Sequence, residues 1–194
     1  VKSVLHVGRC LIGSASKPLL VRLVSTPPTG WGFPAPLQVA LSGWEFVLEL
    51  GTNYGYSALR MARNLSPSAI ITTIEIDHGL AAIAEAVITF AGMADRINQI
   101  RGEARRVIPQ LAEPFDLIFV DHLKEAYLDD LNLLERAGLV REGTVVVSDN
   151  VVIFETQLRA YLSHLRDSGA YESALHQPAG GSDGIEVSIR LATP

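Results

Sequence analysis

Residues 46–57 of this 194-residue chain read FVLELGTNYGYS and hold the features that decide its fold. The stretch opens with a short apolar run, Phe46–Leu50, which is typical of a buried strand. Glycines follow at positions 51 and 55, and glycine permits a tight turn and a close backbone approach. From Tyr56 to Leu65, apolar residues recur at helical spacing. A strand, a glycine turn and a helix in this order predict the first unit of an α/β fold, in which the helix N-terminus offers free N–H groups to a ligand.

The same alternation of strand and helix continues toward the end of the chain. Apolar or β-branched runs predict further strands at residues 69–76, 97–100, 115–120, 144–148, 171–176 and 185–191. Helical spacing predicts further helices at residues 80–90, 104–111, 127–139 and 157–166. Strict alternation implies parallel strands with helices on both faces, and a hairpin joining the last two strands makes the final strand antiparallel. The expected fold is therefore a doubly wound, mostly parallel seven-stranded α/β sheet.

Composition divides the chain into two zones. Residues 1–44 carry four basic residues, no acidic residue and five of the ten prolines. This zone shows no sustained period, so we expect an irregular N-terminal extension. This zone could be a poorly ordered extension or an organelle-targeting segment, and its composition is compatible with both. Residues 45–194 are expected to form a single domain.

The bulk composition excludes several classes of protein. With 48% hydrophobic residues the chain is not disordered, and its single cysteine, Cys10, cannot form an internal disulfide or a cysteine-rich zinc site. No window of about 18 residues is both apolar and uncharged, so we expect no membrane span. A net charge of −5 without a block of Lys or Arg argues against a nucleic-acid partner. These features are typical of a cytoplasmic enzyme that acts on a small molecule, and they leave the oligomeric state open.

The residues that directly follow the predicted strands are the candidate ligand site, because ligands bind at the carboxyl ends of strands in such sheets. Glu75 lies 24 positions beyond Gly51, where an acidic side chain can accept the hydroxyls of a ribose. The glycine turn lacks the Gly-x-Gly of dinucleotide sites. This favours a nucleoside whose other end is a small zwitterion, such as S-adenosylmethionine, over NAD. Each feature also has a simpler explanation when it is considered alone. The glycines could form an ordinary turn between a strand and a helix, and Glu75 could be a carboxylate on the protein surface.

Oxygen-bearing side chains follow the fourth and fifth predicted strands. Asp121 ends the fourth strand, and Asp149 and Asn150 end the fifth. Two carboxylates and an amide oxygen form the kind of hard site that Mg²⁺ prefers. Lys124 stands on the same rim. The alternative is that the two aspartates cap the helices that follow them.

From about Val47 to Ala192 the sequence resembles the catechol O-methyltransferase family, S-adenosylmethionine-dependent enzymes with the class I methyltransferase fold. The matching strings include VLELG at 47–51, GYSA at 55–58, TIEI at 73–76, DH at 121–122, DNV at 149–151 and DG at 183–184. The resemblance implies Mg²⁺-dependent transfer of a methyl group from S-adenosylmethionine to a hydroxyl of a catechol or similar vicinal diphenol.

The resemblance also implies a role for each matching residue. Asp121, Asp149 and Asn150 would hold Mg²⁺. Asn150 and Lys124 would contact the substrate, and Lys124 would take the proton from the attacking hydroxyl. The residues expected around the cofactor are Glu75 at its ribose, Glu49, Gly51 and Ser57 at its methionine end, Ile76, Ala104 and His122 near its adenine, and Asp121 beside it.

Several positions depart from the family pattern. Residues 1–44 show no match to the family's first helices, and the tryptophan expected after the histidine is Leu123. A proline is replaced around Phe154, a serine of the adenine turn is Ala104, and a glutamate that orients the substrate falls near Gln177. Two other functions therefore stay open: a cofactor-binding relative with impaired catalysis and, disfavoured by the glycine spacing, an NAD-binding oxidoreductase.

Overall fold

The computed structural model describes residues 44–177 and 181–192. The strands are β1 (Phe46–Leu50), β2 (Ile70–Glu75), β3 (Ile97–Arg101), β4 (Phe115–Val120), β5 (Val140–Ser148), β6 (Tyr171–His176) and β7 (Ile185–Arg190). The helices are α1 (Tyr56–Asn64), α2 (His78–Phe90), α3 (Ala104–Val107), α4 (Tyr127–Arg136) and α5 (Arg159–Asp167), with 3₁₀ turns η1 (Ile108–Gln110) and η2 (Lys124–Ala126). The expectation for residues 1–44 lies outside the described residues, except for Trp44.

The strands form one seven-stranded sheet in the order β3-β2-β1-β4-β5-β7-β6. The first five strands are parallel, and β7 runs antiparallel to both β5 and β6. This arrangement confirms the predicted fold class. From β1 the chain adds β2 and β3 on one side of the sheet. It then returns to the other side of β1, where it adds β4 and β5. The carboxyl ends of β1 and β4 therefore flank the switch point at which such sheets bind ligands.

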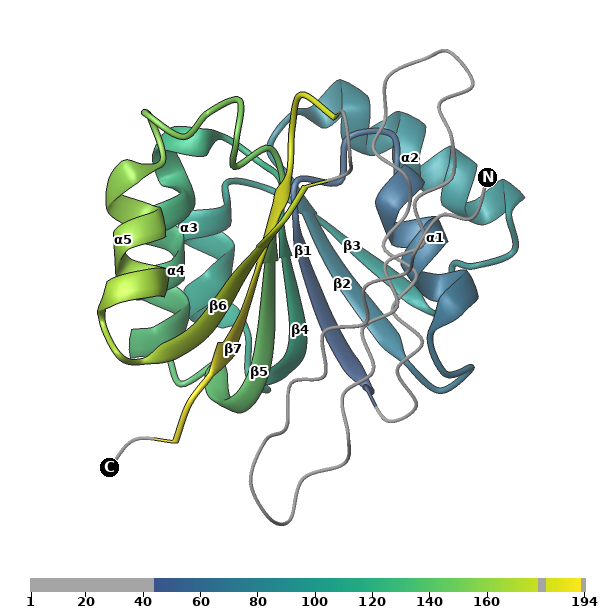
Figure 1. The fold of residues 1–194 in the computed structure, drawn as a ribbon. Coiled ribbons are helices and arrows are strands. Elements are labelled where there is room, and N and C mark those ends of the chain that lie inside the picture. Colours follow the sequence, from purple (N-terminus) through teal and green to yellow (C-terminus); the bar gives the residue numbers. More distant parts are fainter. Residues whose placement is uncertain (1–43, 178–180, 193–194) are drawn as a thin grey trace, which may run out of the picture.

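Helices cover both faces of the sheet, with α1 and α2 on one side and α3, α4 and α5 on the other (Figure 1). Consecutive residues of one strand pack into different layers, as strand geometry requires. Val47 belongs to the apolar cluster that contains Ala58 of α1, whereas Leu48 belongs to the cluster that contains Leu131 of α4. Within the described part of the chain, no helix has the length and apolar character needed to cross a membrane.

Two predicted helices are too long, each for a local reason. The helix predicted over residues 104–111 is one α-helical turn followed by η1, because Pro109 has no N–H to donate. The helix predicted over residues 127–139 ends at Arg136. Gly138 adopts a φ of 71°, which stops the helix and turns the chain into β5.

Strand β5 begins at Val140, four residues before the predicted start. Three of its four added residues, Arg141, Glu142 and Gly143, are exposed and not hydrophobic, so apolar periodicity does not reveal this part of the strand. They are held by contacts to β4: Arg141 pairs with Asp116 at 2.6 Å, and Thr144 Oγ1 donates to the backbone oxygen of Phe115 at 2.7 Å. Pairing with a neighbouring strand, rather than local sequence, sets this boundary.

Candidate functional site

The turn between β1 and α1 passes so close to the end of β4 that its first residue must be glycine. Gly51 has a φ of 99°, and a Cβ at this position would lie 2.5 Å from the backbone oxygen of Asp121. The turn is fixed to β2, because the N–H groups of Gly51 and Thr52 donate to the Ile74 oxygen at 3.0 and 3.3 Å. The predicted glycine turn and Asp121 thus lie against each other at the switch point.

A pocket opens between this turn, helix α1 and the sheet. The residues that line it include Gly51, Asn53, Ser57, Leu117, Phe119, Asp121, Val147, Asp149 and Ile185. Three residues predicted for the cofactor, Gly51, Ser57 and Asp121, therefore share one pocket with a predicted metal ligand, Asp149. The pocket is polar near the turn and apolar along the sheet.

Glu49 lies beneath the turn and is not among the residues that line this pocket. Its side chain is 0% exposed and accepts a hydrogen bond from Thr73 Oγ1 at 2.5 Å. Burial raises the pKa of Glu49 to about 7, although hydrogen bonds from Ser57 and Thr73 act in the opposite direction. Its Oε1 atom is buried without a hydrogen-bond partner among the described residues. Glu49 is therefore buried behind this pocket, whose lining includes Ser57.

A second pocket lies on the other side of the turn. Its lining includes Gly51, Glu75, Ile76, Ala104, Asp121 and His122. Glu75 accepts hydrogen bonds from the N–H groups of Asn53 and Asp77 at 2.8 and 2.9 Å, which fix its carboxylate at the mouth of the turn. The residues predicted for ribose and adenine are thus gathered in one place.

His122 is held in this second pocket by two neighbours. Its Nε2 atom lies 2.8 Å from Asp130 Oδ2, and its ring stacks on that of Tyr127 with centroids 5.2 Å apart. Its Nδ1 atom is buried and has no hydrogen-bond partner in the described part of the chain. A ring nitrogen in this position can form a hydrogen bond with a ligand.

Asp121 and Asp149 follow adjacent parallel strands, β4 and β5, and line the same pocket. Burial and the negative charge of Asp121 together raise the pKa of Asp149 to about 6. Asn150 follows with a φ of 61°, a left-handed conformation that asparagine tolerates better than most residues. The three predicted metal ligands therefore lie together at the carboxyl ends of two neighbouring strands.

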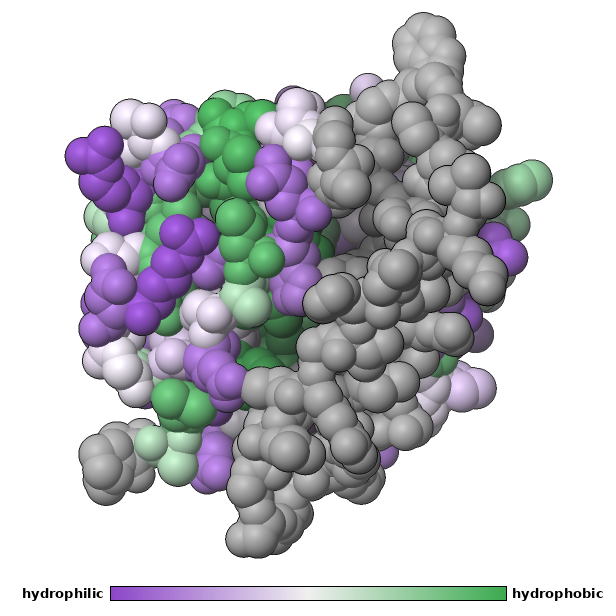
Figure 2. All heavy atoms as spheres, viewed as in Figure 1, coloured by the Kyte–Doolittle hydropathy of each residue, from purple (hydrophilic) through white to green (hydrophobic). Residues whose placement is uncertain are grey.

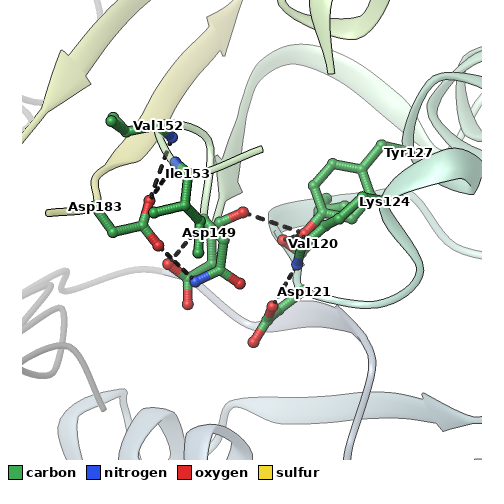
Figure 3. A network of polar contacts seen from close by, with 9 residues as sticks. Val120, Asp121, Lys124, Tyr127, Asp149, Val152, Ile153 and Asp183 are labelled. Carbon is green, nitrogen blue, oxygen red and sulfur yellow. Dashed lines mark hydrogen bonds and ion pairs between the residues drawn. The ribbon is translucent and has the colours of Figure 1, made fainter. Parts of the chain in front are cut away.

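Asp183, just before β7, orients the amide of Asn150. Asn150 Nδ2 donates to Asp183 Oδ2 at 2.8 Å, so the amide oxygen is turned away from Asp183. The other oxygen of Asp183 accepts from the N–H groups of Val152 and Ile153 (Figure 3) and also from that of Gly184. Despite partial burial, which acts in the opposite direction, these hydrogen bonds hold the pKa of Asp183 below its usual value. Asp183 is thus a fixed, charged support for a predicted metal ligand.

Lys124 lies across the ends of the same two strands (Figure 3). Its Nζ atom donates to Asp121 Oδ1 at 2.9 Å and to the Tyr127 hydroxyl at 2.7 Å. It also lies 5.7 Å from the ring centroid of Phe154. The side chain is only 11% exposed. The predicted base is therefore held beside a predicted metal ligand.

The donor set fits a hard divalent cation. Two carboxylates and an outward-turned amide oxygen are the ligands that Mg²⁺ takes, usually with waters or substrate completing the shell. A divalent cation bound here would offset the burial and the charge of Asp121, which together raise the pKa of Asp149. Among the described residues, no group of three His, Cys, Asp or Glu side chains offers a competing metal site.

The sequence reasoning assigned no role to two residues of this site, Asp183 and Tyr127. Asp183 belongs to the matching string DG at 183–184, and this match is the sequence feature that points to it. Burial raises the pKa of Tyr127 well above its ordinary value, so its hydroxyl stays protonated. The sequence around Tyr127 does not indicate a functional role, because its position in the predicted helix is already explained if it packs in the core.

A family model described as O-methyltransferase matches residues 33–160, more than half of the chain. The chain belongs to the O-methyltransferase family. This membership confirms the predicted methyltransferase and contradicts the NAD-binding oxidoreductase. Catechol O-methyltransferase of Sus scrofa is 45% identical to this family member over 152 residues, which are 74% of this chain and 81% of the pig protein. Catechol O-methyltransferase B of Danio rerio is 40% identical over 76% of this chain, which spans only 58% of the zebrafish protein.

Solved structures of other O-methyltransferases share the fold. The enzyme from Bacillus cereus in complex with SAH superimposes with a TM-score of 0.70 and 28% identity, over 79% of this chain and 76% of that one. TomG from Streptomyces achromogenes, in complex with SAM, gives a TM-score of 0.67 and 28% identity, over 77% and 74% of the two chains.

The rim of this candidate site carries exposed apolar side chains. Apolar side chains gather over the carboxyl ends of the strands, at the top of the view in Figure 2. Leu123, Ile153 and Phe154 are 59%, 54% and 37% exposed. Gln177, near the position of the family's glutamate, donates from its amide to the Gly181 oxygen at 3.1 Å. Two of the departures from the family pattern, Leu123 and Phe154, thus lie on this rim, whereas Ala104 lines the second pocket.

Proposed function

We propose that the protein transfers a methyl group from S-adenosylmethionine to a hydroxyl of a catechol or similar vicinal diphenol, with Mg²⁺ as the metal cofactor, in the cytoplasm. One observation carries the proposal. Asp121, Asp149, Asn150 and Lys124 lie together at the ends of β4 and β5, and Asp121 also lines both pockets beside the glycine turn.

The two pockets suit the two ends of the cofactor. Glu75 is positioned to accept the ribose hydroxyls, and Ile76, Ala104 and His122 line the space for the adenine. On the other side of the turn, Ser57 and Asp121 offer polar groups to a methionine end that carries both an ammonium and a carboxylate. The glycine turn joins the pockets, because Gly51 lines both. A sulfonium bound across it would lie next to Asp121.

Asp121, Asp149 and Asn150 would hold Mg²⁺ through side-chain oxygens. The ion, when bound, stabilises the ionised form of a coordinated hydroxyl and fixes its direction. An unassisted phenolic hydroxyl has a pKa of about 10 and is mostly protonated at neutral pH. Asp183 would preset the amide oxygen of Asn150, since it already occupies the amide nitrogen.

Lys124 would receive the proton of the attacking hydroxyl. A lysine acts as a base only in its neutral form, which partial desolvation and a nearby dication both favour. Lys124 is mostly buried and lies beside Asp121, so a metal bound there would be close to Nζ. The apolar rim of Leu123, Ile153 and Phe154 would exclude water from the acceptor ring.

A second candidate is a relative that binds the cofactor without effective catalysis. The observation in its favour is Gln177, whose amide is bonded to Gly181 at the position where the family has a substrate-orienting glutamate. Such a protein would bind S-adenosylhomocysteine in a calorimeter yet show no Mg²⁺-dependent affinity for a catechol. The enzyme proposed above would show both.

The direct test is incubation with radiolabelled S-adenosylmethionine, Mg²⁺ and a panel of catechols. We expect labelled ether product, its loss with a chelator and its return with excess Mg²⁺. Asp149→Asn should abolish transfer, whereas Asp129→Asn makes the same chemical change at an exposed aspartate of α4 and should leave the rate unchanged. Absence of transfer, or transfer indifferent to the chelator, would contradict the proposal.

A further inference from the structure

Tyr127 is a buried phenol that contacts residues of the second pocket and of the predicted metal site. It begins α4, and its side chain is 0% exposed. Its ring stacks on His122 of the adenine-side pocket with an interplanar angle of 13°. Its hydroxyl reaches the ends of the two strands that carry the predicted metal ligands. No role in the proposed reaction has yet been assigned to it.

The hydroxyl of Tyr127 has a complete set of partners. It donates its single hydrogen toward the Val120 oxygen at 2.9 Å, with the Asp149 backbone oxygen 3.3 Å away. It accepts a hydrogen bond from Lys124 Nζ at 2.7 Å. The carbonyls belong to the ends of β4 and β5, which are rigid parts of the sheet. The position of the phenolic oxygen, and with it the position of Nζ, is therefore set by the sheet.

Two of the three N–H directions of Lys124 are occupied within the described residues. One hydrogen goes to Asp121 Oδ1 at 2.9 Å and one to the Tyr127 oxygen. These two bonds fix the ammonium group and leave one direction at Nζ for the acceptor hydroxyl.

We propose that Tyr127 is a positioning residue that, together with Asp121, fixes the direction in which Lys124 Nζ meets the acceptor hydroxyl. The inference rests on the proposed methyl transfer. In that step the hydroxyl O–H bond breaks and its proton goes to Nζ. The oxygen forms the new bond to the methyl carbon, and the S–CH₃ bond breaks with its electron pair left on sulfur as a thioether. Without Tyr127, Nζ would keep only its bond to Asp121 and could rotate about it.

The test compares Tyr127→Phe with Tyr161→Phe. Tyr161 is also a buried tyrosine, but its hydroxyl bonds to Ser148 Oγ at 2.6 Å and has no bond to Lys124. General-base catalysis contributes about 10²- to 10⁴-fold, and we expect Tyr127→Phe to lose about tenfold in kcat with KM values within twofold. Tyr161→Phe should retain the kcat of the wild type. Equal losses in the two variants would overturn the inference.

A double-mutant cycle separates positioning from a general structural role. In a Lys124→Ala background the base is absent, so Tyr127→Phe should cause no further loss of kcat. A merely structural tyrosine would lower kcat in both backgrounds. Crystals of Tyr127→Phe give a readout independent of activity, in which Nζ should leave its place between Asp121 and residue 127. If Nζ keeps its place in the Tyr127→Phe crystal, the inference is contradicted. If Nζ moves in that crystal but the wild-type protein shows no methyl transfer, the result counts against the proposed function alone.

Discussion

Asn150 and Asp183 are joined by a hydrogen bond of 2.8 Å that determines which end of the Asn150 amide faces Asp183. The carboxylate can only accept, so it selects the amide nitrogen and turns the amide oxygen outward. Asp183 stays charged in this position because its pKa is held below the usual value. Supports of this kind orient metal ligands in proteins and affect affinity without touching the ion.

Replacing Asp183 with alanine should weaken Mg²⁺ more than it weakens the cofactor. Loss of such a support typically costs about 10- to 100-fold in metal affinity. We expect the Mg²⁺ concentration for half-maximal transfer to rise by about tenfold or more, with the affinity for S-adenosylhomocysteine within twofold of the wild type. Asp129→Ala is the control, and a Mg²⁺ requirement unchanged in Asp183→Ala would disprove the orienting role.

Gly51→Ala should destabilise the fold more than Gly143→Ala does. Both glycines have positive φ values, 99° and 83°, so both substitutions carry backbone strain of about 1–3 kcal/mol. Only at Gly51 does the new Cβ meet an atom, the Asp121 oxygen at 2.5 Å, whereas Gly143 has nothing within 4 Å. Urea unfolding should show the larger loss of stability for Gly51→Ala, and calorimetry should show loss of S-adenosylhomocysteine binding in that variant alone. Similar stabilities for the two variants would disprove the close approach.

Glu49→Gln should stabilise the cofactor-free protein, and more strongly at pH 8 than at pH 5. Burial raises the pKa of Glu49 from 4.5 to about 7. Below pH 4.5 the carboxyl is protonated in both the folded and the unfolded chain, so folding carries no penalty from it. As the pH rises toward 7 the unfolded chain releases this proton while the folded chain keeps it, which lowers the free energy of unfolding by about 3 kcal/mol in total.

Urea unfolding of wild type and Glu49→Gln at the two pH values measures this effect. Glutamine cannot ionise, so the variant escapes the penalty at pH 8. Glu85→Gln, at an exposed glutamate that pairs with Arg101, is the control. A stability difference between wild type and Glu49→Gln that is the same at pH 5 and pH 8 would contradict the raised pKa.

Glu75→Gln should weaken the cofactor and leave the Mg²⁺ requirement unchanged. Glu75 already accepts two backbone hydrogen bonds, and its remaining acceptor capacity faces the second pocket. Hydrogen bonds to a charged group contribute about 1.5–3 kcal/mol, which corresponds to a rise of about tenfold or more in the KM for S-adenosylmethionine. A changed Mg²⁺ requirement with an unchanged KM for S-adenosylmethionine would show that Glu75 acts on the metal and not on the cofactor, and would contradict this assignment.

Sequence reasoning reached the parts of the fold and site that depend on local pattern. The strand ends at Glu75, Asp121 and Asp149 follow apolar runs, and parallel strands bring such ends to one edge of the sheet. The bond between Asn150 and Asp183 spans 33 positions and depends on β7 lying beside β5, which no local pattern encodes. The start of β5 was missed for the same reason, since contacts to β4 determine it.

The central claim is that oxygens of Asp121, Asp149 and Asn150 converge on a divalent cation beside a bound cofactor. The most direct measurement is a crystal structure of the protein with Mg²⁺, S-adenosylhomocysteine and a nitrocatechol. The account predicts Mg²⁺ with these three side chains as ligands at about 2.0–2.1 Å, both catechol oxygens in its shell, and Lys124 Nζ within hydrogen-bond distance of one of them. A nitrocatechol bound without the ion, or an ion held by other residues, would contradict it.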